Sequence, residues 1–356
     1  MPGPDSKKVD LSHNFGDLAQ AFDGAARAAG EVIEHSYTIA GFCLRLRFAG
    51  PALVPYIVPA FSHLPRGKQN GPALSICIWD SASTRTLRPA IPWVVRDDER
   101  FATGRTPHPR RFYAFYQPAQ KSVSMLDADR NVGLYWIHDA RTLPYYESGA
   151  PLRVILQWWM ATHGLQLVHA GAVGTPAGGV LLVGKAGSGK STAALACLLA
   201  GLSFAGDDYV LIRTTPSPFV FSLYNSAKLH KEHLKRFLDL SRAVWNDDRP
   251  GDEKGIVFIH QRYPERTPSG FPLRAVLLPR ILDGAECSTQ GISASVALAA
   301  MASSTIFQLP GAGEGALQAM AGLIQQLPCF VLSMGSDISR IAPTVSRLLD
   351  GVLTAA

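Results

Sequence analysis

Runs of apolar and polar residues divide the chain into two parts of different character. The first part contains one alanine-rich helical stretch, at 18–29, followed by short runs in which apolar and polar residues alternate, as they do in half-buried strands. Strands are expected there at 38–48, 74–80, 112–116, 122–126 and 132–137. We therefore expect residues 1–148 to form a mostly-β module.

From about residue 150 the pattern changes to apolar strands with helices between them. A linker is expected at 141–149, and a helix at 151–163 that Pro151 opens, because proline suits a first helical turn. Further strands are expected at 165–173, 179–183, 209–213, 219–224, 255–260, 273–280 and 329–333, and further helices at 191–202, 229–240, 292–304, 314–326 and 338–351. This alternation predicts an α/β domain over residues 149–356.

A glycine-rich loop stands between the apolar run 180–183 and the expected helix 191–202. Its sequence fits G-x-x-x-x-G-K-[ST], in which glycines let successive backbone N–H groups surround phosphate oxygens in front of a helix N-terminus. The pattern predicts a nucleotide-binding loop in which Lys190 contacts the β- and γ-phosphates and Ser191 binds Mg²⁺. The expected nucleotide-binding residues are Gly184, Lys185, Ala186, Gly187, Ser188, Gly189, Lys190, Ser191 and Thr192.

Two adjacent aspartates, Asp207 and Asp208, directly precede the apolar strand expected at 209–213. Neighbouring side chains of an extended chain point to opposite sides, so one carboxylate can face a metal ion and the other an incoming hydroxyl. A simple Gly-Asp-Asp turn is the structural alternative. His169 lies in the expected strand 165–173, where it is either a buried core histidine or a partner of these acids.

The order of these motifs resembles the catalytic domain of the HPr kinase/phosphorylase family, whose P-loop fold is related to that of phosphoenolpyruvate carboxykinase. The resemblance covers residues 150–351 and rests on His169, the glycine-rich loop and the aspartate pair. It implies that Asp207 is the base for an acceptor hydroxyl, that Asp208 helps to hold the metal, and that His169 lies beside them. The arginine- and glycine-rich signature of the true HPr enzymes is absent from the sequence, so the resemblance implies the broader HPr-kinase-like set, with an acceptor other than HPr.

Together these features predict an ATP-dependent kinase that uses Mg²⁺ and acts on a hydroxyl of a peptide, a protein or a small molecule, with Asp207, His169 and Lys190 as catalytic residues. Lys228 and Lys254 are either surface lysines or further contacts to the transferred phosphoryl group. The alternatives are a P-loop ATPase or nucleotide-dependent switch, for which Asp283 offers a carboxylate after a strand, and a nucleotide-binding module without turnover.

Composition narrows the class of protein. Apolar residues make up 47% of the chain and charged residues 17%, which is typical of a packed globular protein. The net charge of +6 is mild, so a nucleic-acid partner is not expected. No apolar run approaches the roughly 18 residues of a membrane-spanning helix, and the five cysteines form no C-x-x-C pair, so we expect a cytoplasmic protein without a membrane partner. Homo-oligomer formation stays open. The arginine cluster, interpreted as a solvated loop or alternatively a phosphate-facing lip, is Arg96, Arg100, Arg105, Arg110 and Arg111.

Overall fold

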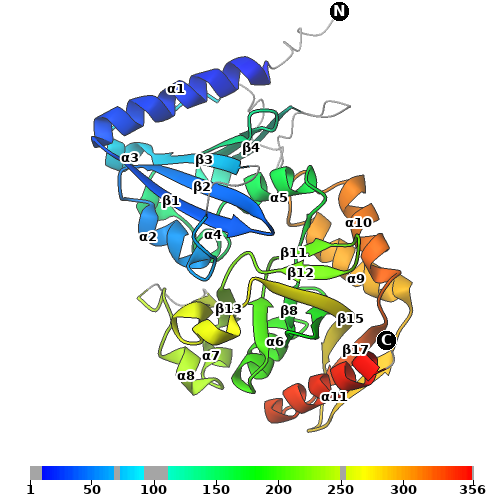
Figure 1. The fold of residues 1–356 in the computed structure, drawn as a ribbon. Coiled ribbons are helices and arrows are strands. Elements are labelled where there is room, and N and C mark those ends of the chain that lie inside the picture. Colours follow the sequence, from blue (N-terminus) through cyan, green and yellow to red (C-terminus); the bar gives the residue numbers. More distant parts are fainter. Residues whose placement is uncertain (1–9, 68–72, 92–110, 249–253, 355–356) are drawn as a thin grey trace, which may run out of the picture. The chain divides into compact units, whose positions relative to one another are not determined.

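The computed structural model describes residues 10–67, 73–91, 111–248 and 254–354, and shows a mixed α/β protein with mixed sheets (Figure 1). The chain forms two compact units. The first comprises Met1–Tyr37, Phe42–Tyr56 and Gly67–Pro144, and the second comprises Thr38–Gly41, Ile57–Arg66 and Tyr145–Ala356. Arg96, Arg100, Arg105 and Arg110 lie outside the described residues, whereas Arg111 pairs with Asp127.

The first unit is built on a six-stranded sheet with the strand order β1-β2-β3-β6-β5-β4. The strands are β1 (Val32–Ile39), β2 (Phe42–Ala49), β3 (Ala73–Asp80), β4 (Phe112–Gln117), β5 (Ser122–Asp127) and β6 (Val132–Ile137), with short helices α2 (Val54–Ile57) and α3 (Ser81–Thr84). The prediction of one strand at 38–48 is wrong. The chain turns at Ala40 and Gly41, both with positive φ (51° and 87°), and the run is divided between β1 and β2.

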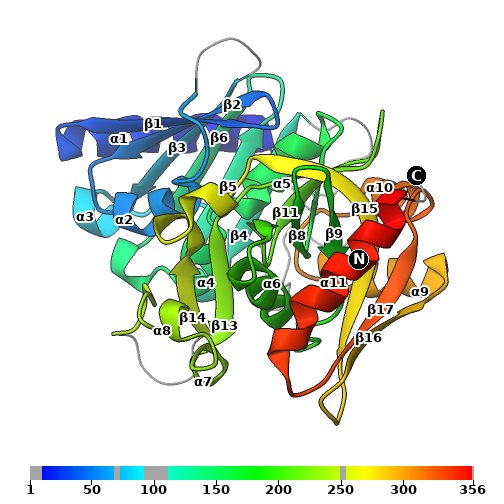
Figure 2. The same cartoon turned by 60° about the horizontal axis from the view of Figure 1, so that its bottom comes forward.

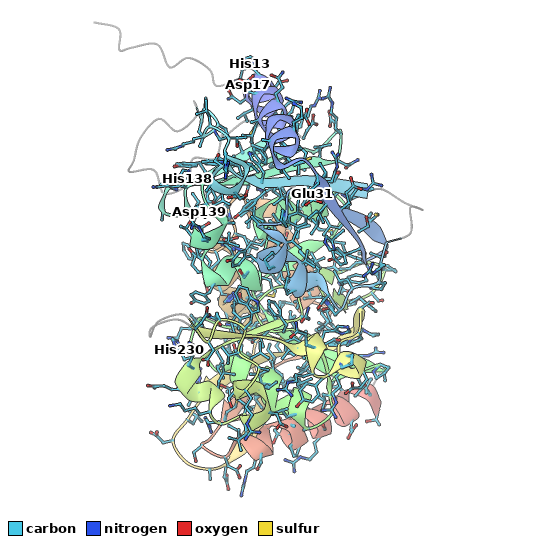
Figure 3. The ribbon with its side chains drawn as sticks, turned by 90° about the vertical axis from the view of Figure 1, so that its left-hand side faces the viewer. His13, Asp17, Glu31, His138, Asp139 and His230 are labelled. Atoms are coloured by element: carbon cyan, nitrogen blue, oxygen red, sulfur yellow. The ribbon has the colours of Figure 1, made fainter. Side chains whose placement is uncertain are left out.

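Helix α1 (Leu11–Ala29) packs on this sheet. It begins well before residue 18 because the Asp10 side chain accepts hydrogen bonds from the N–H groups of Ser12 and His13, which caps the helix. Its buried face packs into the core around Trp79 of β3 and Trp136 of β6. The buried apolar residues of the helix are Phe15, Leu18, Phe22 and Ala25. The exposed side chains of His13 and Asp17, labelled in Figure 3, lie 3.5 Å apart (Nε2 to Oδ2) on this helix.

The second unit contains a larger sheet with the order β10-β8-β9-β15-β12-β11-β7, to which β17 and β16 are added beside β15. Its strands are β7 (Gln166–Val168), β8 (Gly171–Thr175), β9 (Gly178–Leu182), β10 (Ser203–Gly206), β11 (Val210–Arg213), β12 (Phe219–Phe221), β15 (Gly270–Ile281), β16 (Cys287–Gly291) and β17 (Cys329–Met334). A separate antiparallel pair is formed by β13 (Ser226–His230) and β14 (Lys254–Phe258). The long strand β15 runs parallel to β9 and β17 but antiparallel to β12, so this sheet is also mixed.

The helices of the second unit are α4 (Tyr145–Gly149), α5 (Arg153–Ala161), α6 (Lys190–Leu199), α7 (Lys231–Leu234), α8 (Leu238–Ser241), α9 (Ala294–Ile306), α10 (Glu314–Ile324) and α11 (Ile341–Thr354). Helix α6 is almost wholly buried and packs against α11 (Figure 2). The linker expected at 141–149 contains α4, and α5 starts only at Arg153, since Leu152 has a φ of 59°. None of the helices in the described parts of the chain is long and apolar enough to cross a membrane.

Candidate functional site

The glycine-rich loop joins β9 to the N-terminus of α6, the order that its sequence predicts. Three of its glycines have positive φ: 140° at Gly184, 79° at Gly187 and 101° at Gly189. At Gly189 any other residue would meet backbone strain, and its Cβ would lie 2.3 Å from Cε of Met334, so the methionine side chain would have to shift. These conformations bring the loop and the first turn of α6 around one small cavity.

Lys190, the first residue of α6, has its ammonium group on this loop. The side chain is buried, and Nζ donates hydrogen bonds to the carbonyl oxygens of Gly184 (2.7 Å) and Lys185 (3.1 Å). Burial lowers the pKa of Lys190, while Asp207 and Asp208 oppose this shift. The loop therefore carries a buried cation close to the two carboxylates.

The sheet brings His169 and the aspartates together through two neighbouring strand connections. β8 pairs with β10 through Ala172 and Gly206, and β7 pairs with β11 through Val168 and Val210. Residues 169–170 connect β7 to β8, and residues 207–209 connect β10 to β11. Because β7 pairs with β11 and β8 pairs with β10, these two connections lie next to each other. His169 thus lies between two strands, and its predicted position inside one strand is wrong. Its Nε2 donates to Oδ1 of Asp208 at 3.1 Å.

Asp207 is the more deeply buried of the two acids, with 2% of its surface exposed. Its Oδ2 accepts the backbone N–H of Lys228 at 2.9 Å, whereas Oδ1 has no hydrogen-bond partner among the described residues. Burial raises the pKa of Asp207, although the Lys228 N–H, the nearby Ser191 hydroxyl and Lys190 act in the opposite direction. Asp207 is therefore a carboxylate with raised proton affinity and one unpaired oxygen, which is what a general base requires.

Asp208 has two basic partners. His169 donates to one of its oxygens, and the ammonium group of Lys228 contacts the other. Burial alone would raise the pKa of Asp208, but Lys228 and His169 hold it well below its ordinary value. Lys228 thus contacts both acids, one through its backbone and one through its side chain. Its stem passes Gly149 of α4, where an added Cβ would lie 3.0 Å from Lys228 Cδ.

Replacing Lys228 with methionine is expected to lower the free energy of unfolding by about 1–3 kcal/mol at neutral pH, because Asp208 loses its cationic partner. The low folded-state pKa of Asp208 contributes stability above the unfolded pKa of about 4 and loses it as the pH falls through the folded value. The difference between wild type and variant should therefore close in acid. Urea unfolding at pH 7 and below pH 4 measures this.

The matched control is the double variant Lys228→Met/Asp208→Asn. Since the second change removes the carboxylate that the first leaves unpaired, the double variant should cost less than the sum of the two single changes. Strict additivity would mean that the pair contributes nothing.

Two adjoining cavities surround these groups. The smaller, of about 120 Å³, is lined by the loop, Ser191, Thr192, both aspartates and His230, which is labelled in Figure 3 at the end of β13. The larger, of about 280 Å³, is lined by Arg153, Tyr209 and Lys228 among others. The residues common to both are His169, Ala186, Asp208 and Lys254. More spacious cavities, of about 490 and 580 Å³, contain none of the predicted site residues.

The structure thus gathers most of the predicted site residues around these two cavities, including Lys228 and Lys254. Lys185 is exposed and lines neither cavity, and Ser188 lies in the loop with its buried Oγ lacking a hydrogen-bond partner within the described chain. Asp283, the strand-end carboxylate of the alternative hypothesis, is exposed and also lines neither cavity.

Sequence reasoning missed the far wall of the larger cavity. Arg153 donates from Nη1 to Oε1 of Glu147 at 2.6 Å, and its guanidinium lies 5.9 Å from the ring centre of Tyr146 and 6.0 Å from that of Tyr209. The Tyr209 hydroxyl donates to Oε1 of Gln308 at 2.8 Å, and burial raises the pKa of Tyr209, so the phenol stays protonated. The position of Tyr209 directly after Asp208 was the one available signal.

Comparison with known proteins adds little to this geometry. No protein-family model matches the sequence, and no curated protein matches it. Among solved structures, the chain is similar to the Hpr(Ser) kinase/phosphatase from Coxiella burnetii, with 11% identity, a TM-score of 0.29, and coverage of 52% of this chain and 95% of that one. A likeness this weak carries no argument about function, so the function must be argued from the side chains.

Proposed function

We propose that this chain is an ATP-dependent kinase that transfers the γ-phosphoryl group to a hydroxyl of a peptide, a protein or a small molecule. The observation that carries the proposal is the position of Asp207. Its raised pKa and unpaired Oδ1 occur in the wall of the cavity that the glycine-rich loop, Lys190 and Ser191 also line. The second unit would then be a P-loop domain of the HPr kinase and phosphoenolpyruvate carboxykinase type.

In the proposed reaction, the loop N–H groups and Lys190 hold the phosphates of ATP in the smaller cavity. Asp207 accepts the proton of the acceptor hydroxyl while the acceptor oxygen forms a bond to the γ-phosphorus. The bond from that phosphorus to the oxygen shared with the β-phosphate breaks, and ADP leaves with the electron pair. Lys190 and Lys254 supply positive charge around the group in transfer, and His169 keeps Asp208 oriented.

The residues present fit a magnesium ion. Mg²⁺ prefers hard oxygen ligands and, with a nucleotide, takes only one or two from the protein. The Ser191 hydroxyl lies beside Asp207, and Asp208, with its low pKa, lines the same cavity, so Ser191 and Asp208 would hold the ion. When bound, it would offset the negative charge of the β- and γ-phosphates. Within the described chain no group of three or more His, Cys, Asp or Glu side chains forms a metal site by itself.

The test is ADP production with Mg²⁺ and labelled ATP, in the presence and absence of candidate acceptors. We expect turnover to depend on an acceptor and the label to appear on it in equal amount to the ADP formed. Steady ATP hydrolysis without any labelled acceptor would instead support an ATPase or nucleotide-dependent switch. Binding of ATP without turnover would leave only a nucleotide-binding module.

A further inference from the structure

Several residues that line the larger cavity, Arg153 among them, have no role in the reaction proposed above. It shares a wall with the smaller cavity, the proposed phosphate site, since His169, Ala186, Asp208 and Lys254 line both. A group bound in it would therefore lie next to Asp208 and, across the shared wall, close to Asp207 and the proposed phosphate site. Its volume of about 280 Å³ is just below the roughly 300–1,000 Å³ of small-molecule sites. It fits a group the size of an amino acid.

The charge of this lining is mostly positive. Three cationic side chains, Arg153, Lys228 and Lys254, line the cavity, and Asp208 is the only carboxylate among the described residues that does so. Asp208 already contacts Lys228, so these two charges largely cancel. Arg153 is paired with Glu147, which does not line the cavity, so the free edge of its guanidinium and the ammonium group of Lys254 remain for a ligand. A cavity with this balance favours an anion over a neutral molecule of the same shape.

Arg153 is held in a manner suited to a ligand. Glu147 accepts from Nη1, and the rings of Tyr146 and Tyr209 lie within about 6 Å of the guanidinium, which restrains its plane. Its Nε is buried and has no hydrogen-bond partner among the described residues. Buried polar atoms without partners are rare, and each needs an explanation, of which a bound group is one. His169 Nδ1 and Asp207 Oδ1, on residues that line these cavities, are unpartnered in the same way.

We propose that the larger cavity is the acceptor pocket, and that it selects an acceptor carrying a carboxylate or phosphate close to the hydroxyl to be phosphorylated. Arg153 and Lys254 would bind the anionic group, and the hydroxyl would then point across the shared wall towards Asp207, the proposed base. This inference rests on the proposed kinase function, because it names the class of acceptor. A purely structural ion pair between Arg153 and Glu147 is the competing explanation.

Three compounds with one carbon skeleton test the selection: glycerol, D-glycerate and glycerol 3-phosphate. Each is titrated calorimetrically into the full chain, alone and with Mg²⁺ and a non-hydrolysable ATP analogue. We expect at least one of the two acids to bind ten times more tightly than glycerol, and the better acid distinguishes a carboxylate from a phosphate site. Equal affinity for glycerol, or no binding of any of the three, would overturn the proposal.

The decisive variant is Glu147→Gln/Arg153→Gln, which removes both charges together and leaves no unpaired carboxylate. It should lose the preference for the acid, whereas Arg153→Lys should retain part of it. Should the double variant fail to fold in a thermal melt, Lys254→Met serves instead, and it should reduce the preference severalfold. An undiminished preference in the folded variants means that the acid binds elsewhere.

These measurements separate the two proposals, because calorimetry needs no turnover. Selective binding of an acid without transfer of phosphate to it would sink the kinase assignment and leave the anion pocket. Transfer to a neutral hydroxyl with no preference for acids would instead support the kinase assignment and overturn the anion pocket.

Discussion

Asp207→Asn should reduce the rate of phosphoryl transfer by about 10²- to 10⁴-fold, the range for loss of a general base. Asparagine has nearly the shape of aspartate, and its side-chain oxygen can still accept the Lys228 N–H that Oδ2 accepts now. It cannot take up the hydroxyl proton. The affinity for ATP should change little, because Lys190 and the loop N–H groups, not Asp207, are proposed to hold the phosphates. Single-turnover transfer and nucleotide titration measure the two effects separately.

Asp208→Asn is the matched control for this variant. Because Asp208 is proposed to hold the metal, its loss should raise the Mg²⁺ concentration needed for half-maximal rate. Asp207→Asn should instead stay inactive at any Mg²⁺ concentration. The two roles are exchanged if the metal dependence follows Asp207, and full activity of Asp207→Asn removes the base assignment altogether.

Measuring the folding stability of Asp207→Asn tests whether the variant loses activity because it unfolds. Because the folded-state pKa of Asp207 is raised, the contribution of this group to stability is complete below the unfolded pKa of about 4 and falls as the pH rises through the folded value. Removing the charge should therefore stabilise the protein at neutral pH, and this gain should vanish in acid. Thermal melts at pH 7.5 and at a pH below 4 give the comparison. A functional group that costs stability is common in active sites.

The loop could be predicted from sequence because its determinants are local. Strand β9, the glycines and helix α6 follow one another within a short stretch, and each glycine is required by the φ of its own residue. The same holds for α11 and β17, whose apolar patterns predict them close to their observed bounds.

The contact between His169 and Asp208 could not be derived from sequence pattern in the same way. It depends on two connections that cross between the same pairs of strands, β7 with β11 and β8 with β10. The run 165–173 contains no proline, and a single histidine among apolar residues does not signal a break, so the pattern predicts one strand where the chain bends. The resemblance to HPr kinases placed the histidine beside the aspartates, but the bend that brings it there is a tertiary feature.

The ion pair of Glu147 and Arg153, which holds the far wall of the larger cavity, could not be predicted from sequence for a related reason. Glu147 occurs in a stretch that has too little apolar periodicity to predict a helix, although α4 forms there. Its burial comes from tertiary packing, and Arg153 neutralises its charge. Residues six apart do not have the i,i+3 or i,i+4 spacing of helical ion pairs, so their spacing does not predict this pair.

Lys190→Ala should weaken both ATP binding and transfer, and should lower kcat/KM on the order of 10²- to 10³-fold, as expected for one buried donor to a reacting group. The ammonium group now bonds to the carbonyl oxygens of Gly184 and Lys185, so its position on the loop is already set before phosphate arrives. Its lowered pKa reflects burial, which phosphate charge would offset. Lys185→Ala, in the same loop, removes an exposed lysine whose contribution comes from its backbone, so its loss should be at least ten times smaller. Nucleotide titration and steady-state kinetics of both variants measure these losses. Equal losses would mean that the positive charge of the loop, rather than the buried ammonium group in particular, binds the phosphates.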